Sequence, residues 1–549
     1  MADLSAIIIE RYEALLTIRR PWETLWSDIA QYVMPRRAPN MTGSFQTQTP
    51  NTDTEARLFD TTAVQANMTL AAGQMSWMSP MEAAWFSFEP EGKNAQDEAR
   101  LWLAAATDNA REELARSNFY KAIHEVYLDR GAFGTACLYI EPGKKQSLNC
   151  QVWPVGTFVI DEDEDGDVDT VIREFELTAR QAAAKFGEDN ISPKVRKQLG
   201  DNKSHQKSCY IHAIYPRADA DRDKVKVDEE NMPIASVYID KTNKHHVKSA
   251  GYAEMPVMVS RYLEWGSGYG SLYGWAPSFA ALPEARQLNF LQKMMDALAE
   301  KMAFPPVLAP DELEGEIDGN ANGVTYYSQD LNGAMPTEWM TAGRYDIGLQ
   351  RVEARQKAVN EAFHVDLFKM FAQIQKQMTA TEVAERSNEK LIQFSPTFAQ
   401  LTTELFNPFL ERMFNVLQRL GKIEEAPPSL DAGYKITYSS RIALALRALP
   451  AIGYNRTLER LAGVSQIVPD VLDNYDFDAA ERETAISDGV PQDFLREVSD
   501  RDEIRQARAE AQQAQQEAEM AAQAAESAAK LGNVPNDSAV GKVIGEELA

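Results

Sequence analysis

The apolar residues near the start of the chain recur at the spacing of one helical face. In residues 21–34, PWETLWSDIAQYVM, the positions that follow this spacing are Trp22, Leu25, Trp26, Ile29, Tyr32 and Val33. Pro21 suits a first helical turn, and Pro35 ends the helix. Glu23, Asp28 and Gln31 make the run too short and too polar for a signal peptide. The pattern predicts a helix that docks on the core of its own protein.

The apolar period changes from helical to strand-like further along the chain. Residues 1 to about 130 are mostly helical in pattern, whereas residues from about 136 to 265 contain short strand-like runs. These runs are ACLYIEP, CQVWPVGTFVID, DTVIREFEL, CYIHAIYP, ASVYID and PVMVSRYLEW. The first region, 1–277, is therefore expected to begin with helices and to contain a β-rich section.

Two long helices with a compact insertion between them are predicted next. In the first, 278–304, an a/d seam is formed by Leu288, Leu291, Met295, Leu298 and Met302. Residues 305–343 are rich in Gly and Pro and form a small inserted module. The second helix, 344–369, has its own apolar seam, so the two helices are expected to pack as a hairpin-like stalk.

The remaining third of the chain returns to helices and then loses its large apolar residues. Residues 370–378 form a junction, and Thr379 and Glu382 make a capping box that opens a helix in the region 379–450. The region 451–549 includes a helix built from Ala, Gln and Glu. That helix is either a solvated tail or packs closely against identical neighbours, and the end after Gly532 is expected to be disordered.

Composition narrows the function classes. The 549 residues carry a net charge of -26, which argues against a protein that grips DNA through Lys and Arg. It leaves room for a protein that encloses DNA without adhering to it. The longest uncharged stretch, residues 61–81, contains several polar side chains and is expected to be a buried helix rather than a membrane span.

No catalytic, metal or cofactor motif emerges from the residues. The acidic run 161–169, DEDEDGDVD, matches a calcium loop in part, but Ile172 stands where a bidentate Glu is required. A hairpin turn around Asp165 and Gly166 explains the run better. The three cysteines lack metal-ligand spacing, and no phosphate-binding Walker loop is present. We therefore expect no enzyme activity, no cofactor and no metal.

The order of these elements resembles the portal, or head-to-tail connector, proteins of T7-like short-tailed bacteriophages. The stretches that carry the resemblance are RPWETLWSDIAQYVMP, GDVDTVIREFELTARQAAAKFG, ALPEARQLNFLQKMMDALAEKMAFPPVL, MTATEVAERSNEKLIQFSPTFAQLTTELFNPFLERMFNVLQRLG and DNYDFDAAERETAISDGVP. Each is weak alone, but together and in this order they are specific. They cover most of the chain.

The resemblance implies an α+β, mainly helical fold that assembles into a ring of identical subunits, usually twelve. Its parts are a wing (1–277 and 379–450), stem helices (278–304 and 344–369), a clip (305–343), a channel loop (370–378), and a crown with a barrel helix (451–549). Double-stranded DNA would be packaged and ejected through the ring at one capsid vertex of the virion, after synthesis in the bacterial cytoplasm. The implied partners are major capsid and scaffolding proteins, the terminase motor, and tail adaptor and internal core proteins, without a membrane.

The channel loop provides the candidate DNA-facing residues. By the resemblance, the segment 368–378 contributes a loop at the narrowest part of the channel, with Lys369, Gln373 and Lys376 as candidates. The segment contains no acidic residue, so a ring would repeat its lysines as a positive belt facing phosphate. The alternative is that the lysines only solvate a helix junction.

Two other functions remain open from the residues. A coiled-coil scaffold or assembly protein would use the Ala-rich helix, although the β-rich section and broken helices count against it. A metal-dependent DNA-processing enzyme would use the acidic run 161–169, whose spacing favours a turn.

Overall fold

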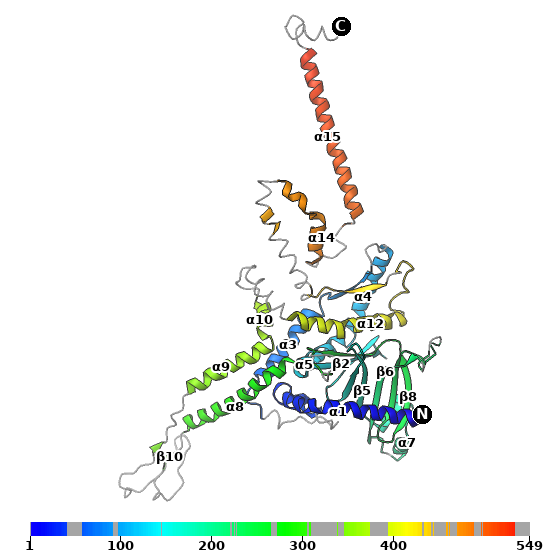
Figure 1. Ribbon diagram of the computed structural model, residues 1–549, viewed down its shortest axis with the longest axis vertical. Coiled ribbons are helices and arrows are strands. Elements are labelled where there is room, and N and C mark those ends of the chain that lie inside the picture. The colour runs from blue at the N-terminus through cyan, green and yellow to red at the C-terminus, as the bar shows by residue number, and fades with distance from the viewer. Residues whose placement is uncertain are drawn as a thin grey trace. The chain divides into compact units, whose positions relative to one another are not determined.

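The computed structural model divides into two compact units, Met1–Leu446 and Arg447–Ala549 (Figure 1). The structure describes residues 2–40, 57–91, 97–143, 145–201, 203–219, 222–223, 226, 228–264, 272–304, 307–308, 337–338, 345–373, 394–430, 433–440, 443, 457–458, 460–461, 469–487, 496 and 498–532. The capping box at Thr379 and Glu382, Lys376, and the end after Gly532 lie outside these residues.

The first helix, α1 (Ala2–Val33), is longer than the sequence pattern predicted. Its second half carries Trp26, Ile29 and Val33, all buried in the main core, which confirms that this face docks on its own protein. The expected start at Pro21 is wrong, because Pro21 lies inside the helix. A proline removes one backbone hydrogen bond, and here the buried residues before and after it hold both halves of the helix in place.

Helices make up one layer of the first unit. They are η1 (Pro35–Asn40), α3 (Thr62–Met78), α4 (Asp97–Arg116), α5 (Phe119–Phe133), the π-helix η3 (Thr402–Phe406) and α12 (Asn407–Arg419). The uncharged stretch forms α3, which is buried along much of its length as expected. Strand β1 (Phe86–Pro90) pairs antiparallel with β12 (Tyr434–Tyr438). This pairing brings two distant parts of the chain side by side in the helical layer.

The predicted β-rich section forms two antiparallel sheets. The three-stranded sheet has the order β3-β2-β9, from β2 (Thr135–Pro142), β3 (Leu148–Trp153) and β9 (Val257–Arg261). The five-stranded sheet runs in chain order through β4 (Phe158–Glu162), β5 (Val168–Thr178), β6 (Lys207–Pro216), β7 (Ile234–Asp240) and β8 (His245–Tyr252). Helices α6 (Ala179–Phe186) and α7 (Pro193–Gly200) interrupt the strands, which the strand pattern did not predict.

Two long helices run side by side in the first unit, as the seam predicted (Figure 1). They are α8 (Pro277–Ala303) and α9 (Tyr345–Ala362). The short strands β10 (Val307–Leu308) and β11 (Thr337–Glu338) pair antiparallel beyond the helix ends. The expectation of one continuous helix over 344–369 is wrong, because α9 ends at Ala362 and α10 (Val365–Gln373) begins after a break.

The second unit contains η4 (Pro469–Asn474), α14 (Phe477–Ser487) and α15 (Val498–Gly532). Asp478 of α14 pairs with Arg501 and Arg505 of α15 and ties the two helices together. Residues 502–523 of α15, in the Ala-rich stretch, are all exposed. No helix within the described part of the chain is long and apolar enough to cross a membrane.

Candidate assembly stalk and channel segment

The stalk formed by α8 and α9 is held by a short apolar seam. Leu288, Met295 and Val352 form a buried cluster, and Leu291 packs against it in part. Gly348 of α9 lets the helices approach here, since a Cβ atom at this position would lie 2.2 Å from the Met295 sulfur. Leu298 is half-buried, and Met302 is 52% exposed. The stalk-packing residues predicted from sequence therefore come together at 288–295, and the seam opens toward 302.

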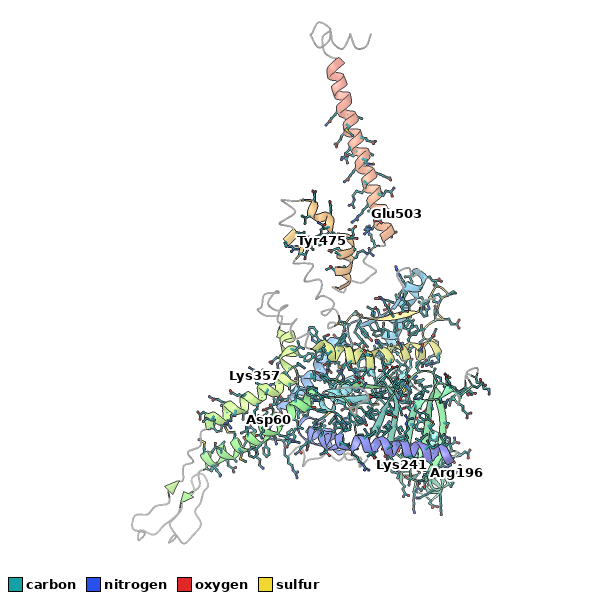
Figure 2. All side chains as sticks on the ribbon, in the orientation of Figure 1. Asp60, Arg196, Lys241, Lys357, Tyr475 and Glu503 are labelled. Carbon is teal, nitrogen blue, oxygen red and sulfur yellow. The ribbon has the colours of Figure 1, made fainter. Side chains whose placement is uncertain are left out.

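Polar contacts fix the base of the stalk to the rest of the first unit. Arg355 of α9 pairs with Glu284 of α8, and Arg286 of α8 pairs with Asp28 of α1. The amide of Gln356 donates a hydrogen bond of 3.2 Å to Asp60, which lies just before α3 (Figure 2). Because the base is anchored from two sides, the stalk has a defined direction relative to the helical layer.

The stalk also carries large apolar side chains that its own chain does not cover. On α8 and just beyond it, Phe290 is 57% exposed and Phe304 is 68% exposed. The full set, named here the stalk apolar surface, is Phe290, Met294, Met302, Phe304, Tyr345, Ile347 and Leu349. Large apolar side chains exposed along two paired helices, on more than one side, are candidates for contact with other chains.

The backbone breaks between α9 and α10, a few residues before the predicted channel segment. His364 adopts a positive φ of 54°, which is uncommon for a residue with a side chain. The break turns the chain so that Phe363, Val365, Leu367 and Phe368 are all buried in the main core. Their burial explains why the helix does not continue straight through this position.

The structure places the three channel candidates differently. Lys369 lies on α10 and is exposed. Gln373 is the last residue of α10, and Lys376 lies outside the described residues. The first part of the expected loop, 370–373, is thus helical. The role of Lys369, Gln373 and Lys376 in a channel, with the two lysines as a positive belt, stays a prediction.

The acidic run forms the turn between β4 and β5, as predicted. Gly166 has a φ of 91°, and the backbone N–H groups of Asp165 and Asp167 donate to Asp163 Oδ1 at 2.9 and 3.0 Å. Asp163 therefore caps the turn with its side chain. Across the described residues, no group of three or more His, Cys, Asp or Glu side chains is arranged to hold a metal ion.

One structural residue near this turn was missed from the sequence. Arg261, at the end of β9, is buried and pairs with Glu162 of β4 and with Glu404 of the π-helix η3. It also donates to the Gly166 carbonyl at 3.2 Å. Burial raises the pKa of Glu404, while the charge of Arg261 opposes this effect. A single arginine in a strand gives no sequence signal that it will join three distant elements.

Comparison with known proteins agrees with the resemblance found in the sequence. Residues 6–495 match the family described as "Bacteriophage head to tail connecting protein". The chain is 30% identical over 487 residues to the "Probable portal protein" of Bordetella phage BPP-1, covering 86% of this chain and 85% of that protein. It is 27% identical over 516 residues to the "Portal protein" of Salmonella phage epsilon15, covering 92% of this chain and 91% of that protein.

These matches run through the helical start, both sheets, the stalk and the return helices, which are the parts that carried the resemblance. They confirm the prediction of a portal protein and favour it over the coiled-coil scaffold and the metal-dependent enzyme. The chain belongs to the bacteriophage head-to-tail connecting protein family.

Proposed function

We propose that this chain assembles with identical copies into a ring, of twelve subunits as the resemblance implies, through which double-stranded DNA enters and leaves the capsid. The observation that carries the proposal is the stalk apolar surface on α8 and α9. A second copy of the same stalk is an apolar partner that is always available to this chain. If one face of each stalk contacts a different face of the next, repetition of this contact around an axis forms a ring when the rotation closes.

The proposed role is structural rather than catalytic. The ring would stand at one capsid vertex, at the junction of head and tail. Its partners would be the major capsid and scaffolding proteins, the terminase motor, the tail adaptor and internal core proteins. The net charge of -26 on each subunit supports a conduit, because a wall of the same sign as phosphate does not retain DNA along its whole length. A local positive belt at Lys369 and Lys376 would then act as a brake rather than as a binding site.

The exposed helix α15 supports a close association of subunits as well. Its side chains from 502 to 523 are exposed within the described second unit, and small Ala residues allow helices to approach one another closely. We therefore favour packing of α15 against identical neighbours over a solvated tail. In the ring this helix would form the barrel above the crown.

Particle images of the purified full-length chain test the proposal. The wild-type chain is expected to form rings with an axial hole, and Phe290→Asp combined with Leu349→Asp is expected to leave subunits that fold but do not close into rings. Leu101→Asp is the matched control, since Leu101 is 72% exposed on α4, away from the stalk. Rods, or rings that persist in the stalk variant, would contradict the proposed assembly.

A further inference from the structure

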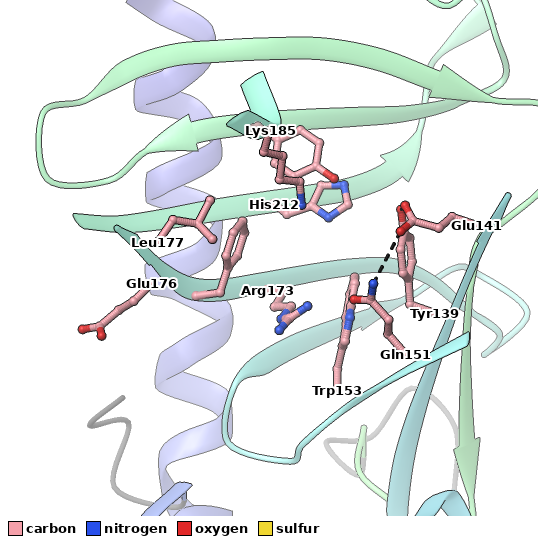
Figure 3. A pocket seen from close by; sticks show the side chains of 11 residues that line it. Tyr139, Glu141, Gln151, Trp153, Arg173, Glu176, Leu177, Lys185 and His212 are labelled. Atoms are coloured by element: carbon pink, nitrogen blue, oxygen red, sulfur yellow. Dashed lines mark hydrogen bonds between the residues drawn. The ribbon is translucent and has the colours of Figure 1, made fainter. Parts of the chain in front are cut away.

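The five-stranded sheet has two faces of different chemistry. On one face, Ile172, Ile211 and Val237 pack against Ile8 and Tyr12 of α1 in a buried apolar cluster. On the other face, the sheet meets the β2–β3 hairpin and helix α6 across a cavity of about 220 Å³ (Figure 3). The lining residues that matter here are Tyr139, Glu141, Trp153, Arg173, Lys185 and His212.

Two cations line this cavity, and aromatic rings lie against both of them. The guanidinium carbon of Arg173 lies 4.8 Å from the ring centroid of Trp153, and the Lys185 ammonium lies 5.0 Å from that of Tyr238. Within the described residues, neither cation makes an ion pair or a hydrogen bond to an acceptor. Burial lowers the pKa of both groups; for Lys185 the charge of Glu141 opposes this effect, and the charge of Arg173 adds to it.

Three buried arginines of the first unit have carboxylate partners. Arg37 pairs with Asp129, Arg261 pairs with Glu404, and Arg412 pairs with Glu254. A buried charge without an acceptor is costly, so chains normally provide one. Arg173, which is partly buried, and Lys185, which is exposed to solvent, have no such acceptor in this cavity, and a negative group placed between them would relieve their mutual repulsion.

The other titratable groups around the cavity leave a positive balance. Glu141 accepts hydrogen bonds from Tyr139, Asn149 and Gln151 on its own sheet, and Glu176 pairs with Lys207 at 3.1 Å. Burial, and then the charges of Lys185 and Arg173, lowers the pKa of His212 well below its usual value, so His212 is neutral. Two cations therefore face one carboxylate that already has hydrogen-bond donors.

We propose that this cavity is a binding site for a compact oxyanion, a carboxylate or a phosphate group, held between Arg173 and Lys185 beside Trp153. The size of the cavity sets the ligand class, because sites for larger organic ligands occupy roughly 300–1,000 Å³. The oxyanion comes either from a free small molecule or from an acidic side chain of a second copy of this chain. The site lies away from the stalk and does not depend on the proposed ring contact.

The test measures anion-dependent stability of the full-length chain at pH 7 and constant ionic strength. Inorganic phosphate or acetate, exchanged for chloride, is expected to raise the melting temperature of the wild type in a saturable manner, as a ligand of the folded state does. Calorimetric titration is expected to give one site per chain. Arg173→Gln and Lys185→Gln should each weaken binding at least tenfold and remove the shift.

Lys194→Gln is the matched control, because Lys194 is an exposed lysine on the neighbouring helix α7. It removes the same charge and should leave the anion response intact. If the wild type does not respond to free anions, sedimentation tests whether the oxyanion is an acidic side chain of a second copy. In that case Arg173→Gln and Lys185→Gln should each lose self-association, and Lys194→Gln should keep it. Absence of both effects, with equal melting temperatures in every anion, overturns the proposal.

Discussion

At the scale of single residues, close approaches decide where helix α10 lies. The ring of Phe368 in α10 lies directly over Gly73 of α3, where a Cβ atom would come within 2.2 Å of the ring. Phe394 contacts both His364 and Phe368, with ring centroids 5.9 Å apart in each case. One glycine and three rings therefore hold the start of the proposed channel loop against the helical layer.

Gly73→Ala is expected to destabilise the first unit by about 1–3 kcal/mol, because an added methyl group in a packed core forces side chains and backbone to shift. Gly200→Ala serves as the control. Gly200 ends helix α7, and a Cβ atom added there would have no other atom within 4 Å, so stability should be unchanged or slightly higher. Denaturant unfolding measures both values. Equal stability of the two variants would show that Phe368 can move aside freely.

The proposed lysine belt also belongs to this scale. Changing Lys376 to Ala, and then Lys369 and Lys376 together, is expected to reduce DNA retention in filled heads and to flatten its dependence on salt, because fewer phosphate contacts remain. Lys357→Ala is the control, since Lys357 is exposed on α9 and pairs only with Glu361 at 3.8 Å among the described residues (Figure 2). Normal retention with an unchanged salt dependence would leave the lysines a solvating role only.

At the scale of elements, the stalk shows what periodicity can and cannot predict. The spacing of Leu288, Leu291 and Met295 located the packed part of α8 correctly, since these residues face α9. The same spacing extended to Met302, which is exposed, because periodicity identifies an apolar face but not which chain covers it. The break at His364 was missed for a related reason: it depends on tertiary burial of its neighbours and not on local propensity.

Leu288→Ala is expected to cost about 2–5 kcal/mol in unfolding free energy, because it leaves a cavity in the only buried cluster described along the shaft of the stalk. Met302→Ala should cost far less in the isolated subunit. If Met302 is covered by a neighbouring copy, the same change should lower ring stability, seen as subunit release on dilution. A large effect of Met302→Ala on the unassembled chain would contradict the exposure of this residue.

The clip is the second prediction at this scale. Strands β10 and β11 pair Val307 with Glu338 and Leu308 with Thr337, so the ends of the segment meet. Replacing residues 309–336 by a short Gly/Ser turn should therefore leave folding and ring formation intact while abolishing docking of the motor or the tail. Pull-down with each partner measures docking, and particle images provide the control for assembly. Loss of soluble protein would show that the segment is part of the core.

At the scale of the whole chain, the first unit has a hydrophobic core of its own, built from residues of both its ends. Buried residues from Trp26 in α1 to Tyr438 in β12 form one cluster. The helical start, the sheets and the stalk could be predicted from residue patterns, and the family from their order. The cavity beside Arg173 could not, because it depends on which strand faces meet, and single cations within strands give no periodic signal.

A chain that ends at residue 446 is expected to keep the unfolding transition of the first unit, because the clusters that form its core lie within residues 1–446. A chain that ends at residue 421 should lose it, since it lacks β12 and the ring of Tyr434, which packs on Phe88 and Phe414. Calorimetry compares the two. Loss of the transition in the longer chain would show that the second unit is needed for folding.

The pairing of β1 with β12 also means that one strand is synthesised long before its partner. Phe86 leaves the ribosome about 350 residues before its partner Tyr438, which at 5–20 residues per second is roughly 18–70 s. Throughout this interval the rings of Phe86 and Phe88, buried in the finished subunit, lack their final cover. Nascent copies on one messenger RNA would contact one another through these exposed aromatic side chains and not through the surfaces of folded subunits. We therefore expect rings of subunits to form only from completed chains that have left the ribosome. We also expect growing chains to require a chaperone until β12 has been made.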